Sequence, residues 1–126
     1  MEFSYQQNNN GLFFPAIPLK IFKDEKFLPT IALIDSGATI SIFRPDIAKY
    51  FGLEIETGEE IFLGGVGGRI KGYIHKLKIN TGGKQFLLPI VFSQEYHVSF
   101  NLLGRDTFFE NFLITFDERN LKLKLG

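Results

Sequence analysis

Residues 32–39 read Ala-Leu-Ile-Asp-Ser-Gly-Ala-Thr, an apolar run that ends abruptly in a carboxylate, a hydroxyl and a glycine. A short apolar run bounded by turn residues is typical of a buried strand, so Asp35 stands directly after one. The residues Asp35, Ser36 and Gly37 suit an ordinary turn, in which Asp accepts hydrogen bonds from nearby backbone N–H groups. The alternative is a carboxylate that serves chemistry, and the tripeptide alone does not decide between the two.

The same pattern of short apolar runs separated by turn residues recurs along the chain and predicts a mostly β protein. Short runs rich in Ile, Leu and Phe alternate with turns that contain Gly, Pro, Asn or Asp. We expect strands at 16–22, 27–34, 41–43, 59–63, 69–79, 84–92, 100–103, 113–116 and 121–125. Two short helices are expected, one at 45–51, which opens with a proline suited to a first helical turn, and one at 106–112.

Composition predicts one folded domain over 1–126, with a polar lead-in at 1–11 expected to be mobile. Fourteen Lys and Arg balance fourteen Asp and Glu, so no net charge favours nucleic acid or an anionic membrane. The absence of cysteine excludes disulfides, thiolate zinc sites, iron–sulfur clusters and a Cys nucleophile. Because His75 and His97 are far apart in the sequence, we expect no metal site.

The sequence has no stretch of 18 or more apolar residues, and residues 1–10 lack the basic-then-apolar order of a signal peptide. We therefore expect a soluble cytoplasmic protein, or a part of a larger precursor, without a membrane partner.

A second stretch, 63–72, reads Leu-Gly-Gly-Val-Gly-Gly-Arg-Ile-Lys-Gly and joins two predicted strands. It does not fit a dinucleotide-binding loop, because the GxGxxG pattern counted from Gly65 requires a glycine where Ile70 stands. One interpretation is a flexible hairpin tip. The other is a lid whose glycines allow unusual backbone dihedrals, with Val66 in contact with whatever lies beneath.

A third stretch, 100–106, reads Phe-Asn-Leu-Leu-Gly-Arg-Asp and alone indicates only the end of a strand before a short helix. The order of the three stretches resembles the retropepsin family of aspartic proteases, over roughly residues 16–125. The resemblance implies an all-β, closed acid-protease barrel with a flap hairpin, one or two short helices and no cofactor. It also implies a two-fold homodimer that hydrolyses a peptide or protein substrate.

The chemistry of that reaction fits a short chain that dimerises. Amide hydrolysis by carboxylates needs one base and one acid around a shared water, yet the sequence offers a single Asp-Ser-Gly. In a two-fold dimer each Asp35 meets its symmetry mate. Two ionised carboxylates ~3 Å apart repel by about 5 kcal/mol at an effective dielectric near 20, so the pair would hold one proton between them. This predicts a bell-shaped pH profile centred on the acid side.

By resemblance, Asp35 is catalytic, Ser36 bonds across the two-fold axis and Gly37 lets the backbone approach the substrate. The flap would close over an extended peptide and bond its main chain. Gly104, Arg105 and Asp106 would support the site. Residues that match the family's substrate-binding positions are Ala38, Ile42, Leu63, Gly64, Gly65, Val66, Gly67, Ile70, Phe100 and Leu102. The side chains in this set are apolar, so we expect apolar residues on both sides of the scissile bond.

Two departures from the family stand out. Thr39 occupies the position where retroviral members have an Asp that pairs with the Arg of the Gly-Arg element, so Arg105 needs another partner, such as Asp46, Asp106 or a carboxylate of the second chain. The predicted terminal hairpin replaces a single terminal strand and is more like the cellular or prokaryotic relatives. The rival interpretation is a non-catalytic dimer of the same fold that binds peptides or serves assembly. A serine hydrolase fits less well, because no GxSxG element accompanies either histidine.

Overall fold

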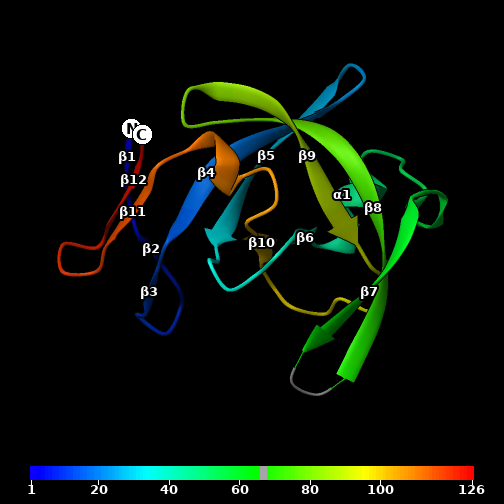
Figure 1. Cartoon of the computed structure of the whole chain (residues 1–126), viewed down its shortest axis with the longest axis horizontal. Helices are drawn as coiled ribbons and strands as arrows, with labels where there is room; N and C mark the ends of the chain where they lie inside the picture. The colour runs from blue at the N-terminus through cyan, green and yellow to red at the C-terminus, as the bar shows by residue number, and fades with distance from the viewer. Residues whose placement is uncertain (66–67) are drawn as a thin grey trace.

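The computed structural model describes residues 1–65 and 68–126 and places most of them in strands (Figure 1). The main sheet holds seven strands, all of which coincide with predicted ones, and β6 and β9 have the predicted bounds. The seven are β4 (Ala16–Lys23), β5 (Lys26–Ile34), β6 (Ser41–Phe43), β7 (Glu59–Gly65), β8 (Gly68–Thr81), β9 (Lys84–Phe92) and β10 (Asn101–Leu103).

The order of these strands is β4-β5-β10-β6-β9-β8-β7, and β4 also pairs with β8. Most neighbours are antiparallel, but β10 runs parallel to β5, and β6 runs parallel to β9. Leu103 pairs with Ile34, so β5 and β10 end together. The residue that follows β5 therefore lies beside the residue that follows β10, and these residues are Asp35 and Gly104.

The main core lies on the inner faces of these strands. In β4, Ile17, Leu19 and Ile21 are buried, whereas Pro18 and Lys20 between them are exposed. This alternation places every second side chain of the strand in the core. Burial of each such aliphatic side chain contributes about 1.5–3 kcal/mol to folding. The largest fully buried side chains are Phe43, Phe92 and Phe108.

The predicted helix at 45–51 is present as α1 (Pro45–Tyr50). Its first residue is a proline, whose fixed φ suits the first turn of a helix and whose missing N–H costs no hydrogen bond there. Ile47 and Ala48 attach the helix to the core because both are buried. A short 3₁₀ helix, η1 (Ile55–Thr57), follows α1, and the sequence did not predict it.

The predicted helix at 106–112 is wrong in type and length. This stretch is mostly turn, with a single 3₁₀ turn, η2 (Phe109–Asn111). Thr107 has a φ of 66°, in the left-handed region, so the backbone cannot continue as an α-helix from Asp106.

A second sheet contains both ends of the chain, in the order β1-β12-β11. The predicted terminal hairpin is formed by β11 (Ile114–Asp117) and β12 (Lys122–Leu125). β1 (Glu2–Ser4) pairs with β12, which places the two termini side by side (Figure 1). β2 (Gln6–Gln7) and β3 (Phe13–Phe14) form a small separate hairpin. The segment 1–11, expected to be a mobile lead-in, thus carries β1 and β2.

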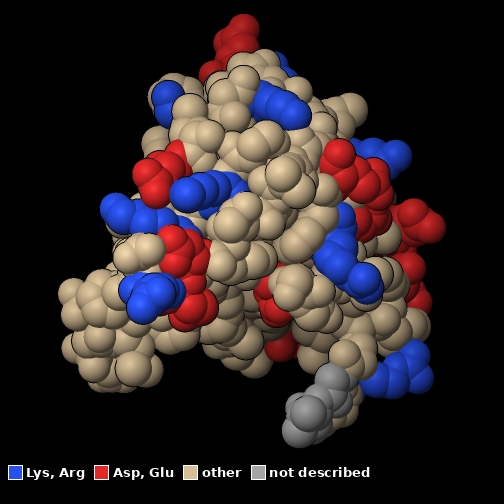
Figure 2. Space-filling model, turned by 60° about the vertical axis from the view of Figure 1, so that its left-hand side comes forward, with Lys and Arg blue, Asp and Glu red and all other residues tan. Residues whose placement is uncertain are grey.

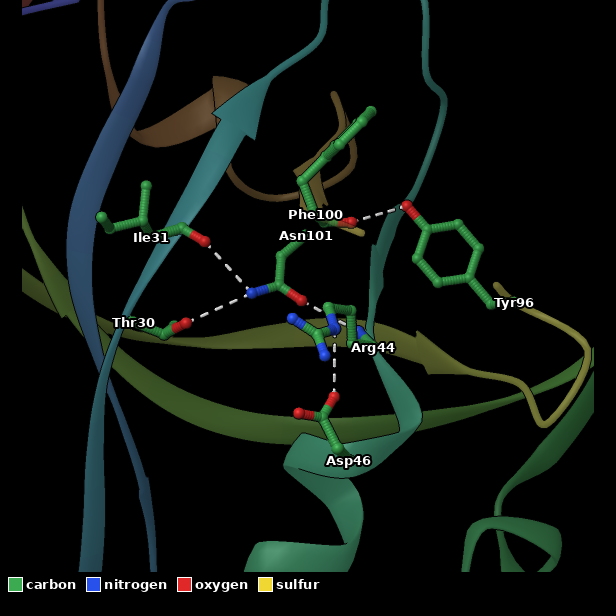
Figure 3. A network of polar contacts seen from close by, with 7 residues as sticks. All are labelled: Thr30, Ile31, Arg44, Asp46, Tyr96, Phe100 and Asn101. Carbon is green, nitrogen blue, oxygen red and sulfur yellow. Dashed lines mark hydrogen bonds and ion pairs between the residues drawn. The ribbon is translucent and has the colours of Figure 1, made fainter. Parts of the chain in front are cut away.

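A buried amide links two strands of the main sheet to the residue that precedes α1 (Figure 3). The side chain of Asn101 is 4% exposed, and its Nδ2 donates to Thr30 Oγ1 at 3.2 Å and to the Ile31 carbonyl at 3.1 Å. Its Oδ1 accepts from the backbone N–H of Arg44 at 2.9 Å. The amide fixes β10 against β5 and against the start of α1, and thereby positions the chain that leads to Gly104.

Candidate active site

The Asp35 carboxylate is held in a tight turn at the end of β5. The backbone N–H of Asp35 donates to the Leu103 carbonyl at 3.0 Å, and the N–H of Gly37 donates to Asp35 Oδ1 at 2.8 Å. The N–H of Ala38 closes the turn onto the Asp35 carbonyl at 3.2 Å. Asp35 is half-buried, whereas Ser36 and Gly37 are exposed. The sequence left a turn and a carboxylate that serves chemistry as alternatives. Asp35 forms the turn and also holds its carboxylate in a fixed orientation, so the two interpretations do not exclude each other.

The chain after β10 supports this turn through its backbone. The N–H of Arg105 donates to the Ala38 carbonyl at 2.9 Å, and the N–H of Asp106 donates to the Thr39 carbonyl at 2.8 Å. The N–H of Gly104 donates to Oγ of Ser41, a side chain with no exposed surface. Because these contacts use main-chain groups, the side chains of Arg105 and Asp106 stay exposed.

Gly104 lies closer to the Asp35 loop than any side chain permits. A Cβ built there would lie 2.5 Å from both the carbonyl carbon and the carbonyl oxygen of Ile40. The obstacle is backbone, so it cannot rotate away as a flexible side chain does. The glycine of the Gly-Arg element is thus explained by packing against the loop that carries Asp35.

A second apolar cluster, separate from the main core, lies beneath the β7–β8 hairpin. It brings together four residues that the sequence placed at substrate-binding positions: Ile42, Leu63, Ile70 and Leu102. Five further members were not predicted: Ile40, Ile61, Ile74, Val91 and Tyr96. Ile61 and Ile74 share strand faces with the predicted Leu63 and Ile70, so the two-residue period of a strand could have found them. Tyr96 comes from a loop and has no such signal.

Tyr96 joins this cluster to the residue that precedes β10. Its hydroxyl donates to the Phe100 carbonyl at 2.8 Å (Figure 3). Burial raises the pKa of Tyr96 to about 12, so the phenol stays neutral and remains a donor.

The other predicted substrate-binding residues lie elsewhere. Phe100 is 46% exposed and faces a different cavity, and Ala38 belongs to the Asp35 turn. Gly64 pairs with Arg69 and Gly65 with Gly68 in the β7–β8 hairpin. The predicted residues Val66 and Gly67 lie outside the described residues.

Side chains from the loop after β9 anchor the β7–β8 hairpin. Glu95 Oε2 accepts from the backbone N–H of Lys71 at 2.7 Å, and Ser93 Oγ donates to the Lys71 carbonyl. β9 pairs with β8 only as far as Tyr73, so these two side chains satisfy backbone groups beyond the end of that strand. Lys71 Nζ lies 3.3 Å from Glu60 Oε2, and this hydrogen-bonded ion pair raises the pKa of the ammonium group.

Arg105 lacks the partners that the sequence offered within the chain. Asp46 pairs with Arg44, with 3.2 Å between Nε and Oδ1, and Asp106 Oδ1 accepts from the Thr107 hydroxyl. Across residues 1–65 and 68–126, no carboxylate lies within ion-pair distance of Arg105. A carboxylate of a second chain remains as the predicted partner.

The described residues contain no group of three or more His, Cys, Asp or Glu side chains arranged to hold a metal ion. His75 donates from Nε2 to the Ile55 carbonyl at 2.8 Å, which joins β8 to η1. In the part of the chain that the structure describes, no helix is long and apolar enough to cross a membrane. Charges of both signs are interspersed over the face shown in Figure 2.

Comparison with known proteins identifies the fold but not a close relative. No protein-family model and no curated protein match the sequence. Among solved structures, the chain is similar to a retropepsin-like aspartic protease from Rickettsia conorii, with a TM-score of 0.71 and 19% sequence identity. The match covers 99% of this chain and 89% of the rickettsial one. The protein therefore has the retropepsin-like fold that the order of its three sequence stretches predicted.

Proposed function

We propose that the protein is an aspartic endopeptidase that acts as a two-fold homodimer with Asp35 of each subunit at its centre. The observation that carries this proposal is the placement of Asp35. Its Oδ1 is oriented by the Gly37 N–H, its backbone is tied to Leu103, and the turn stands at the end of a buried strand in a retropepsin-like fold. A half-buried carboxylate in a fixed orientation is suited to general acid–base chemistry.

The proposed reaction requires a homodimer because one chain supplies only one of the two catalytic carboxyl groups. The chain contains one Asp-Ser-Gly, and one carboxyl group cannot act as base and acid in the same step. A two-fold axis close to Asp35 supplies the second group without any further sequence feature. The proposal takes each subunit to be a closed barrel, which is supported by the pairing of β4 with both β5 and β8.

In the proposed reaction the two Asp35 side chains share one proton, because two adjacent negative charges repel strongly. The ionised member takes a proton from water as the water oxygen attacks the peptide carbonyl carbon. The protonated member gives its proton to the carbonyl oxygen, and the tetrahedral intermediate then collapses with proton transfer to the amine that leaves. No metal or cofactor takes part in this mechanism.

The substrate is an extended peptide with apolar residues beside the bond that is cut. This follows from the apolar cluster of Ile42, Leu63, Ile70 and Leu102 beneath the β7–β8 hairpin. The hairpin acts as a flap that closes over the peptide and excludes water. The peptide binds as an added strand, so backbone hydrogen bonds supply affinity and the apolar pockets supply selectivity.

The test is cleavage of a mixed peptide library from about pH 3.5 to 7.5 by the wild type and by Asp35→Asn. The variant keeps an oxygen that can accept from Gly37 N–H, so it is expected to fold and to bind peptide, but its cleavage should vanish. Wild-type cuts between apolar residues, with a specific activity that rises with dimer concentration, are the expected result. A dimeric wild type that cuts nothing at any pH would refute the protease and favour the peptide-binding module.

A further inference from the structure

The strands β4, β5, β8 and β9 are basic, although the charges of the whole chain balance. These four strands contain more than half of the Lys and Arg residues of the chain and no Asp or Glu. The turn between β4 and β5 adds two carboxylates, Asp24 and Glu25, and Asp24 Oδ2 pairs with Lys23 Nζ at 3.1 Å. Positive charge is therefore concentrated on one part of the sheet.

Exposed side chains of these strands form one row across the sheet. Because β4 pairs with both β5 and β8, and β8 pairs with β9, the four strands present a continuous face, and paired residues point to the same side of it. Phe22 is opposite both Phe27 and Lys78. Lys78 is in turn opposite Leu87, and Phe27 and Leu87 are 51% and 61% exposed. With the neighbouring lysine of β4, this row makes up what we call the basic face: Lys20, Phe22, Phe27, Lys78 and Leu87.

Both lysines of the basic face are held over aromatic rings. Lys20 Nζ lies 5.6 Å from the centre of the Phe27 ring, and Lys78 Nζ lies 5.2 Å from the centre of the Phe22 ring. The attraction between a cation and the face of a ring restricts where each ammonium group goes. Within residues 1–65 and 68–126, neither ammonium group forms an ion pair. The two charges are thus positioned and available to a partner of opposite charge.

The spacing of the two lysines matches an extended peptide. Lys20 pairs with Asn80, so Lys78 is the diagonal neighbour of Lys20 across the two antiparallel strands. Diagonal neighbours are roughly 7–8 Å apart, and alternate side chains of an extended chain are roughly 7 Å apart. Two carboxylates separated by one residue in an extended peptide can therefore reach both lysines together.

The arrangement of the rings favours a peptide over a nucleic acid. Bases of a single strand bind proteins by stacking on the faces of aromatic rings. On the basic face, a lysine already lies over each of the Phe22 and Phe27 rings and competes with a base for that position. The exposed parts of Phe27 and Leu87 remain available to apolar side chains. The face therefore fits a peptide that carries both acidic and apolar residues.

The basic face lies far from the candidate active site. Phe27 is near the start of β5 and Asp35 follows its end, so roughly 27 Å of extended strand separates the two residues. In Figure 1, the β4–β5 turn and the C-terminal end of β7 lie at opposite sides of the view. None of the five residues of the face belongs to the apolar cluster beneath the β7–β8 hairpin. A peptide that occupies both places needs roughly eight residues between them.

We infer that the basic face is an exosite, a second binding surface, which holds an extended acidic and apolar segment of the protein substrate roughly eight or more residues from the scissile bond. The identity of the bound segment as substrate rests on the proposed function. Carboxylates at alternate positions pair with Lys20 and Lys78, and apolar side chains at the next alternate positions contact Phe27 and Leu87.

The first test is binding of a fluorescent peptide to Asp35→Asn, measured by fluorescence anisotropy at low salt. The peptide has Leu, Glu, Glu and Leu at alternate positions with Thr between them, and the reference peptide has Gln in place of Glu. Addition of Lys20→Gln and Lys78→Gln should weaken binding of the acidic peptide by about tenfold. The matched control adds Arg119→Gln and Lys124→Gln, which remove the same charge from exposed residues of the terminal hairpin, and it should bind as Asp35→Asn does.

The second test measures kcat/KM of the active protein for an apolar cleavage peptide alone and with the acidic segment attached. A linker of about twelve residues reaches the face and should raise kcat/KM by about tenfold, whereas a linker of about four residues spans too little and should not. In the variant with Lys20→Gln and Lys78→Gln, the ratio for the long and the unattached peptide should fall toward one.

Several outcomes overturn the inference and leave the proposed function standing. These are equal binding of the acidic and the Gln peptide, equal losses in the two pairs of variants, equal kcat/KM with both linkers, and tighter binding of an oligouridylate than of the acidic peptide. A dimeric wild type that cuts no peptide refutes the proposed function, whereas the anisotropy measurement still decides whether the basic face takes an acidic peptide. Thermal melting of each variant checks that the fold is intact.

Discussion

Replacement of Asn101 by Ala should destabilise the protein strongly, although the side chain is polar. The side chain is 4% exposed and makes three hydrogen bonds, to Thr30 Oγ1, the Ile31 carbonyl and the Arg44 N–H. At about 1 kcal/mol net for each bond, the loss is about 3 kcal/mol. For a domain of this size, that corresponds to a melting temperature roughly 10 °C lower.

A second substitution at the same site separates hydrogen bonding from loss of volume. Asn101→Asp keeps the shape and the acceptor for the Arg44 N–H, but it turns a carboxylate oxygen toward the Ile31 carbonyl, where Nδ2 now lies at 3.1 Å. Burial and this repulsion raise the pKa of the introduced carboxyl in the folded state above its unfolded value. Asn101→Asp is therefore most stable below the unfolded pKa of an Asp, about 4, and it loses stability as pH rises through the folded pKa.

The assay is urea unfolding of wild type, Asn101→Ala and Asn101→Asp at about pH 4 and about pH 7. Asn101→Asp should approach the wild type at the lower pH and fall toward Asn101→Ala at the higher one. Asn10→Ala, at an exposed residue whose side chain bonds nothing in the described chain, is the control and should change stability by less than about 0.5 kcal/mol. A loss below about 1 kcal/mol for Asn101→Ala, or a pH-independent deficit for Asn101→Asp, would show that the amide network is not the source of stability.

Two further predictions concern packing and pH. Gly104→Ala should lower the free energy of unfolding, measured in urea, by about 3 kcal/mol or more, because the new Cβ meets backbone atoms at 2.5 Å. Gly64→Ala is the control, because a Cβ there meets nothing within 4 Å. Equal losses in the two variants would contradict the packing argument. Burial and the hydrogen bond to Glu118 raise the pKa of Tyr5 from 10.0 to about 12 in the folded protein. The stability that the neutral phenol contributes is therefore fully present below about pH 10 and is lost as pH rises toward 12. Tyr5→Phe should lack this alkaline loss, and an unchanged pH dependence of unfolding in the variant would refute the assignment.

The sequence predicted those parts of the fold that leave a local signal. β6 and β9 were found with their observed bounds because apolar runs and turn residues mark both ends. β1 was missed because three residues that pair with β12, at the other end of the chain, leave no local pattern. The second predicted helix failed at Thr107, whose positive φ depends on the turn that packs there and not on residue type.

The candidate site likewise contains residues that the sequence indicates and residues that it does not. The sequence placed Asp35 directly after a strand, and its resemblance to the retropepsin family selected Ile42, Leu63, Ile70 and Leu102, which the structure brings into one cluster. Tyr96 enters the cluster from a loop, and the β2–β3 hairpin meets Leu33 and Phe100 at a separate cavity. These contacts join segments that are distant in sequence, so no local pattern of one chain predicts them.

The attachment of the Lys71 backbone to Ser93 and Glu95 fixes the point at which the β7–β8 hairpin extends beyond β9. From Lys71 to Gly68, β8 advances roughly 10 Å beyond its pairing with β9 and is paired with β7. Within this part of the hairpin, Leu63 and Ile70 pack against the apolar cluster beneath it. The described part of the hairpin is thus held in place by two side chains of a loop and by its own apolar face.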